Sequence, residues 1–160
     1  MKQNYDLKIE SPAFKDGEYL DRKYTGFGQD ISPPFHILNP DGRAVTIAII
    51  MDDLDIPFIR AYNHWLIWNI PVSSEIPEGI PHGEEVPSLG NAVQGIGYGK
   101  NRYRGPKQPA FIRNMHRYVF QFYVLDCILQ IEGRSRKADL VVAMEGHILQ
   151  TGSITGKYKR

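Results

Sequence analysis

The stretch that decides the fold reads Asp52-Asp53-Leu54-Asp55-Ile56-Pro57 and, after six intervening residues, His64-Trp65-Leu66-Ile67-Trp68-Asn69-Ile70-Pro71. The residues before it, from Ala44 to Met51, are almost all apolar, and a second apolar run begins at His64. We expect two buried strands joined by a loop that carries the three carboxylates. Ionisable groups at the ends of buried strands are costly to bury, so they lie at a rim or in a polar site. The sequence therefore predicts a pocket here.

Most other long patterns also predict strands. Residues 5–9 alternate weakly between apolar and polar side chains, and residues 116–126 alternate clearly. A side-chain period of two places His116, Tyr118, Phe120, Phe122 and Val124 on one face of the second run. We therefore expect His116 and Tyr118 to face the same space. A short final strand, residues 153–158, is expected to close a sheet.

One helix is expected, over residues 138–149. Leu140, Val141, Met144 and Ile148 recur there at helical spacing, with His147 at the edge of the apolar stripe, Asp139 near the N-terminus and Gly152 after the C-terminus. Residues 11–35 and 71–97 contain many glycines and prolines and are expected to be mainly irregular. The expected fold class is mainly β.

Length and composition predict one domain, residues 1–160, with a single sizeable core. The N-terminus lacks the apolar stretch of a signal peptide and no run has the length of a membrane span, which predicts a cytoplasmic protein. Seven acids and one base lie from Asp52 to Glu85, whereas nine bases and two acids lie from Lys100 to Lys137. This separation indicates either solvated faces or a basic rim that attracts an anionic ligand.

The residues with useful chemistry are Asp53, Asp55, His64, Tyr103, His116 and Tyr118. Zinc is disfavoured because no histidines have the short helical spacing of a protease motif and no cysteine pair exists. A hydrolytic triad is disfavoured because no Gly-x-Ser-x-Gly motif occurs, and residues 95–109 do not have the spacing of a nucleotide-binding loop. What remains is a small-anion site in which Asp53 holds His64 or His116. For each histidine taken alone, a core imidazole satisfied by a neighbour is the alternative interpretation.

Several motifs, taken together, resemble the phosphatidylethanolamine-binding protein family, whose bacterial branch is called Raf kinase inhibitor-like. Asp53-Leu54-Asp55-Ile56-Pro57, followed by the strand at His64, resembles the family's Asp-Pro-Asp-Ala-Pro signature. Tyr103-Arg104-Gly105 and the later His116-Arg117-Tyr118 resemble its Tyr-x-Gly and His-Arg-Tyr segments. Ile31-Ser32-Pro33-Pro34 resembles its Ile-Ser-Pro segment. The resemblance covers the chain from about Asp30 to Asp126.

The resemblance implies a β-sandwich of antiparallel sheets with a few peripheral helices and an anion pocket for phosphate groups or phospholipid head groups. The residues that match the family's pocket are Asp53, Asp55, Pro57, His64, Tyr103, Gly105, Pro109, His116 and Tyr118. Leu54 and Ile56 depart from the first signature, and Lys107 and Gln108 interrupt the family's proline cluster. These departures predict a pocket mouth of altered size.

The leading functional hypothesis is therefore a non-enzymatic protein that binds a small phosphate-bearing or carboxylate ligand. No catalytic residue, metal or cofactor is expected, and no nucleic acid. The alternative is a protein-interaction module that inhibits a kinase or protease, with residues 73–97 making the contacts. An uncharacterised hydrolase is a third hypothesis, and a homodimer is possible in each case.

Overall fold

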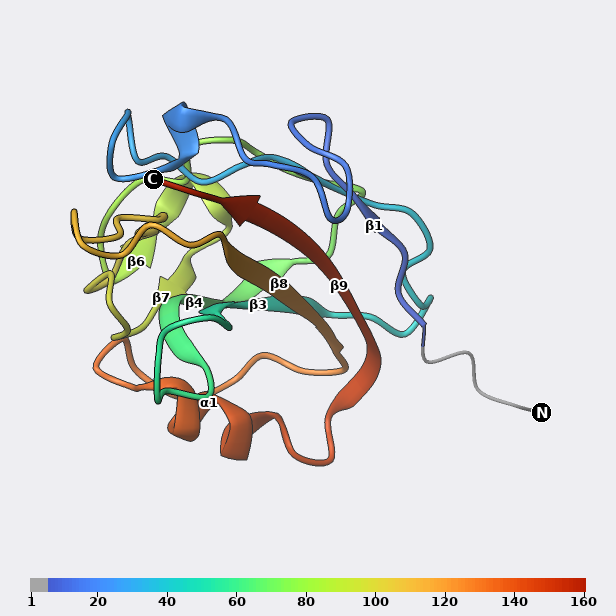
Figure 1. The fold of residues 1–160 in the computed structure, drawn as a ribbon. Coiled ribbons are helices and arrows are strands. Elements are labelled where there is room, and N and C mark those ends of the chain that lie inside the picture. The colour runs from blue at the N-terminus through green and yellow to red at the C-terminus, as the bar shows by residue number, and fades with distance from the viewer. Residues whose placement is uncertain (1–5) are drawn as a thin grey trace.

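Two antiparallel sheets stack face to face in the computed structural model, which describes residues 6–160 (Figure 1). The three-stranded sheet has the order β1-β2-β5, and the six-stranded sheet has the order β6-β7-β4-β3-β8-β9. The strands are β1 (Ile9–Glu10), β2 (Phe35–Ile37), β3 (Thr46–Asp53), β4 (Tyr62–Pro71), β5 (Glu75–Ile76), β6 (Glu85–Val86), β7 (Ala92–Gln94), β8 (His116–Leu125) and β9 (Ile148–Tyr158). The helical elements are α1 (Lys137–Met144) and two 3-10 turns, Arg22–Tyr24 and Pro87–Leu89. The prediction of a mainly β, antiparallel fold with few helices is confirmed.

Strand β3 lies at the centre of the larger sheet, between β4 and β8, and every one of its residues is buried. Its side chains alternate between two cores. Ile47, Ile49 and Met51 pack toward the smaller sheet, whereas Ala48 and Ile50 pack toward α1 and the segment before it. Covering on both faces explains why this strand is apolar at nearly every position instead of at alternate ones.

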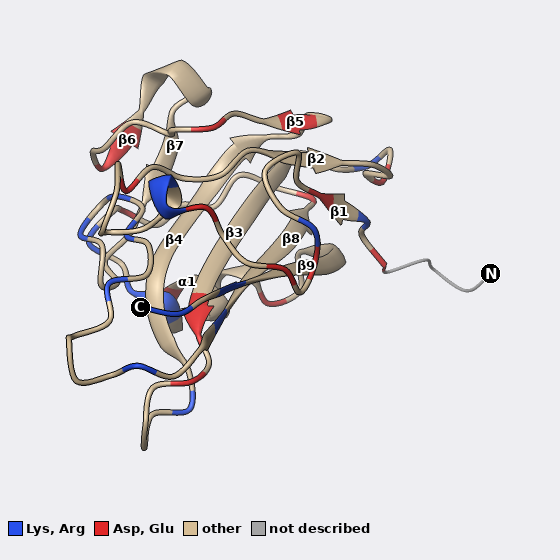
Figure 2. Cartoon of the chain, turned by 45° about the horizontal axis from the view of Figure 1, so that its top comes forward, with Lys and Arg blue, Asp and Glu red and all other residues tan. Residues whose placement is uncertain are grey.

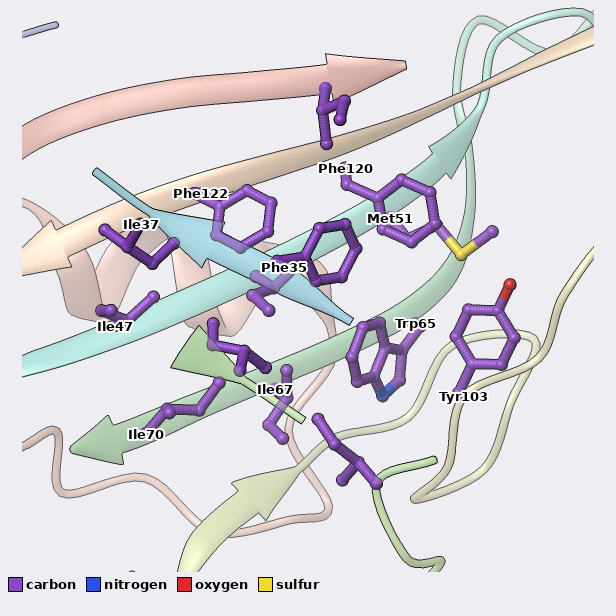
Figure 3. Close-up of a cluster of buried hydrophobic side chains, with 14 of the residues drawn as sticks. Phe35, Ile37, Ile47, Met51, Trp65, Ile67, Ile70, Tyr103, Phe120 and Phe122 are labelled. Atoms are coloured by element: carbon purple, nitrogen blue, oxygen red, sulfur yellow. The ribbon is translucent and has the colours of Figure 1, made fainter. Parts of the chain in front are cut away.

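The main core fills the space between the two sheets (Figure 3). Phe35 of β2 lies against Phe120 and Phe122 of β8, with ring centroids 5.2 Å and 5.0 Å apart. Strand β4 contributes Trp65, whose indole packs edge-to-face with the Tyr103 ring and donates a hydrogen bond to the Gln94 side chain. The alternation predicted for residues 116–126 is confirmed, since the five even-numbered positions from His116 to Val124 are all buried.

The helix predicted over residues 138–149 spans Lys137–Met144 in the structure, so it begins as predicted to within one residue and ends five residues earlier. The Asp139 carboxylate accepts a hydrogen bond from the backbone amide of Arg136, as suits a helix N-terminus. The chain leaves the helix after Met144 and turns at Gly146, whose φ of +79° favours glycine. Ile148 therefore starts β9, which is longer than predicted, and Gly152 lies inside that strand. His147 lies in the turn and not on a helix.

Residues 71–97 are mainly irregular, as predicted, and they also contain three short strands that extend both sheets, β5, β6 and β7. The strand predicted over residues 5–9 is reduced to Ile9–Glu10, with Tyr5 outside the described residues. The largely irregular character of residues 11–35 is confirmed. Within residues 6–160, no helix is long and apolar enough to cross a membrane.

Candidate functional site

A cavity of about 320 Å³ opens at one end of the larger sheet, where β3 ends and β4 and β8 begin. Two loops complete its wall: the loop between β3 and β4, residues 54–61, and the loop that precedes β8, residues 106–115. The lining residues are Asp53, Ile56, Ile59, Tyr62, His64, Tyr98, Lys107, Gln108, Pro109, Ile112, His116 and Tyr118. Five of the nine predicted site residues, Asp53, His64, Pro109, His116 and Tyr118, are among them.

Asp53 and His116 form a buried pair in the wall of the cavity. The His116 Nδ1 lies 2.7 Å from the Asp53 Oδ2, and both side chains are almost completely buried. The other carboxylate oxygen, Oδ1, accepts a hydrogen bond from the backbone amide of Asp55. The His116 Nε2 is buried and has no hydrogen-bond partner in the described chain. The carboxylate thus fixes the imidazole and leaves Nε2 for a ligand.

His64 reaches the same cavity through an irregularity in β4. The β3–β4 register pairs Met51 with Trp65 and Asp52 with Asn63, so His64 is the extra residue opposite them. A bulge of this kind re-aims a side chain next to a binding site. The ring Nδ1 lies 2.8 Å from the backbone oxygen of Arg104, which can only accept, so Nδ1 carries the proton. Burial lowers the pKa of His64, although the Arg104 hydrogen bond opposes the shift.

Aromatic rings surround the two imidazoles. His64 makes edge contacts with Tyr62, Tyr98 and Tyr118, with ring centroids 5.1–5.7 Å apart. His116 stacks on Tyr118 at 6.3 Å. Burial, with a smaller contribution from Asp53, raises the pKa of the Tyr118 hydroxyl far above its ordinary value, so this group stays protonated and can donate a hydrogen bond.

Four predicted site residues lie outside the cavity wall. Asp55 points to the surface, where its carboxylate pairs with the Arg117 guanidinium and lies 2.7 Å from the Arg117 amide. That contact lowers the pKa of Asp55. Pro57 is exposed and does not line the cavity. Tyr103 is buried in the main core, and Gly105 lies against the backbone of Tyr24.

Tyr103 and Gly105 nevertheless support the site, because they hold the Arg104 carbonyl that binds His64. The Tyr103 hydroxyl donates to the Tyr24 backbone oxygen at 2.7 Å. The Gly105 amide donates to the Asp30 carboxylate at 2.7 Å. A Cβ at Gly105 would lie 2.1 Å from the Tyr24 oxygen, so only glycine fits this approach.

Sequence reasoning did not assign seven of the lining residues to the site: Ile56, Ile59, Tyr62, Tyr98, Lys107, Gln108 and Ile112. Ile56 departs from the family's first signature, and Lys107 and Gln108 interrupt its proline cluster. The others lie in loops or at a strand end, where no periodicity predicts orientation. The Gln108 side chain resembles His116 in one respect, since its buried Oε1 also lacks a hydrogen-bond partner among residues 6–160.

Some of the acidic and basic residues that the sequence separates pair with each other in the fold. Lys137 lies 2.6 Å from Asp52, and Arg117 lies 3.0 Å from Asp55. Arg102 and Arg104 both pair with Asp30. Figure 2 shows Lys and Arg in blue and Asp and Glu in red, with blue segments in the loops at the same end of the molecule as the C-terminus. Four of the nine basic residues between Lys100 and Lys137 take part in no ion pair within residues 6–160: Lys100, Lys107, Arg113 and Arg136.

Metal-type ligands gather elsewhere in the described chain, at the opposite end of β8. The ligand atoms of Asp126, Cys127 and His147 all lie within 4.8 Å of one another. The His147 Nδ1 already pairs with the Asp126 Oδ1 at 2.9 Å, and both side chains are exposed. Burial raises the pKa of the Cys127 thiol, which opposes the thiolate that a metal prefers.

Comparison with known proteins gives one consistent result. The family model described as phosphatidylethanolamine-binding protein matches residues 10–159. A UPF0098 protein of Pyrococcus abyssi is 40% identical over 155 residues, which cover 96% of this chain and 85% of the relative. The structure of a phosphatidylethanolamine-binding protein homolog from Chlamydia trachomatis has a TM-score of 0.84 at 31% identity and covers 98% of this chain and 99% of that one. Escherichia coli YbcL shares the fold, with a TM-score of 0.83 at 22% identity, over 97% of this chain and 99% of its own.

Proposed function

The chain belongs to the phosphatidylethanolamine-binding protein family, and from the geometry of its cavity we propose that it binds a small phosphate-bearing or carboxylate anion without transforming it. The observation that carries the proposal is the common arrangement of two imidazoles. His64 and His116 both have Nδ1 tied to a protein oxygen and both line the cavity. Each ring therefore has its Nε2 available for a ligand.

A phosphate group suits this arrangement because it can both accept and donate hydrogen bonds. The Tyr118 hydroxyl can donate to phosphate oxygens, and the His116 Nε2 does so when both ring nitrogens carry a proton. The neutral His64 presents a lone pair at Nε2, which accepts from the hydroxyl of a monoprotonated phosphate.

A binding role is favoured over a catalytic one by what surrounds the histidines. Neither imidazole contacts a serine, threonine or cysteine nucleophile in the contacts of residues 6–160. Asp53 uses both carboxylate oxygens in contacts within the protein, so it is poorly placed as a general base. The interaction hypothesis, with residues 73–97 as the contact segment, gains no specific support, because this segment supplies strands to both sheets.

The proposal is tested by NMR of the imidazole signals during titration with inorganic phosphate and with phosphoethanolamine. Saturable shifts are expected at His64 and His116 and not at His147, which lies at the other end of β8. His116→Gln should weaken phosphate binding by about tenfold or more, because it removes a charge-assisted hydrogen bond. His147→Gln is the matched control and should bind as the unchanged protein does. Absence of saturable shifts at both cavity histidines would contradict the proposal.

A further inference from the structure

Two loops at the cavity mouth carry the same tripeptide. Phe58-Ile59-Arg60 lies in the β3–β4 loop, and Phe111-Ile112-Arg113 lies in the loop before β8. Ile59 and Ile112 both line the cavity. The phenylalanine that precedes each isoleucine does not line the cavity, and the arginine that follows is exposed. Chain segments far apart in sequence thus present the same three side chains around one opening.

The two phenylalanines are the most exposed large apolar side chains of residues 6–160. Phe58 is fully exposed (109%) and Phe111 is 84% exposed. Phe58 also has a φ of +65°, a backbone conformation that is strained for an aromatic residue. Single exposed apolar residues are common, but two aromatic rings at the tips of neighbouring loops, beside an apolar-lined mouth, mark an interaction surface.

The charges beside the rings are positive and unpaired. Neither Arg60 nor Arg113 takes part in an ion pair within the described part of the chain. The nearby acids already have partners within the protein, because Asp55 pairs with Arg117 and the buried Asp53 pairs with His116. In Figure 2 the loops project beyond the strand ends, at the lower left. The mouth therefore combines exposed aromatic rings with free positive charge.

We propose that these two loop tips dock the protein on an anionic lipid bilayer, with Phe58 and Phe111 inserted at the interface and Arg60 and Arg113 on lipid phosphates. A bilayer accepts two convex apolar tips without a shaped pocket. Its lipid phosphates also supply negatively charged partners, which Arg60 and Arg113 do not have within the described part of the chain. Docking in this orientation places the cavity mouth on the head-group layer. The inference rests on the proposed function, because it brings a phosphate-bearing ligand to His64 and His116.

The test is co-sedimentation with vesicles of phosphatidylglycerol and phosphatidylcholine, compared with vesicles of phosphatidylcholine alone. Binding should require the anionic lipid and weaken with added salt. Phe58→Ser and Phe111→Ser should each reduce the partition coefficient by about tenfold, since each removes one inserted ring. Arg60→Gln and Arg113→Gln should each reduce it by about fivefold. Ile128→Ser and Arg134→Gln are matched controls at other exposed sites and should have no effect.

A second readout separates failure of docking from failure of the cavity. The double variant Phe58→Ser/Phe111→Ser should keep the phosphate-induced shifts at His64 and His116, which also shows that it folds. His116→Gln should lose phosphate affinity but stay on the vesicles. Phosphate binding without vesicle binding by the unchanged protein would overturn the docking proposal alone. Self-association that is lost in the double variant, with no vesicle binding, would assign the tips to a second copy and likewise overturn it.

Discussion

The two ends of strand β8 carry the same chemical pair in opposite surroundings. At the start of the strand, His116 pairs with Asp53 at 2.7 Å, and the two side chains are 1% and 3% exposed. Just beyond its end, Asp126 pairs with His147 at 2.9 Å, and the side chains are 42% and 46% exposed. Both pairs use the Nδ1 nitrogen of the imidazole. Distance and atom type therefore do not distinguish them, whereas burial does.

Burial gives the two pairs different roles. Water can replace either partner of the exposed pair, so that pair adds little to stability. Neither partner of the buried pair can be removed without leaving a polar group unsatisfied in the interior. The same burial leaves the His116 Nε2 without a protein partner in the cavity wall. The His116 Nε2, whose burial without a partner costs free energy, is thus the polar atom placed to contact a ligand.

Loss of the buried Asp53–His116 pair should produce the largest change in the free energy of unfolding. Asp53→Ala removes the partner of the His116 Nδ1 and also the acceptor for the Asp55 amide. The free energy of unfolding should fall by about 3–5 kcal/mol, the usual cost of removing one member of a buried pair. Urea denaturation at pH 7 measures this change.

The control for this prediction is the same substitution in the exposed pair. Asp126→Ala should lower the free energy of unfolding by less than about 1 kcal/mol. The double variant Asp53→Leu/His116→Phe should recover part of the stability lost in Asp53→Ala, because it removes both polar partners together. A loss below 1 kcal/mol in Asp53→Ala would show that burial does not separate the two pairs.

The pH dependence of stability should also differ between the buried His64 and the exposed His147. Burial lowers the pKa of His64 below its unfolded value of about 6.5, so the unfolded chain binds the proton first as the pH falls. The free energy of unfolding should therefore decline from about pH 6.5 down to the pKa of the folded state. His64→Gln should remove this part of the pH dependence, whereas His147→Gln should keep it. Denaturation curves between pH 8 and pH 5 measure the slope, and equal slopes for all three proteins would contradict the assignment.

The elements of the fold could largely be predicted where a pattern is long. The apolar run before Asp52 and the alternation from His116 onward each identify a central strand, because burial of one or both faces dictates the pattern. The end of α1 could not be read in this way. Ile148 continues the helical spacing, yet the turn at Gly146 directs it into β9, where it pairs with Leu125. The pairing of β9 with β8 therefore decides the conformation of Ile148, although its spacing in the sequence is helical.

The site was predictable in its polar residues and not in its apolar wall. Asp53, His64 and His116 are ionisable groups beside apolar runs, which is a signal in the sequence. His64 reaches the cavity through a register shift that follows from pairing with β3 and that its own neighbours do not encode. Tyr103 and Gly105 matched a motif, but their contacts are with Tyr24 and Asp30. Motif residues can thus hold the scaffold of a site without lining it.

Ionic strength should give the smallest difference between the two ends of β8. The Asp126–His147 pair is nearly half exposed, so 1 M salt, with a screening length of about 3 Å, should weaken its attraction. The cost of Asp126→Asn should therefore fall from a few tenths of a kcal/mol in dilute buffer to about zero in 1 M NaCl. The backbone amide of residue 126 still donates to the His147 oxygen in this variant, so the turn keeps its geometry. Asp53→Ala, measured alongside, should keep its full cost at both salt concentrations because ions do not reach the buried pair. If both variants responded equally to salt, the contrast would lie in local geometry and not in burial.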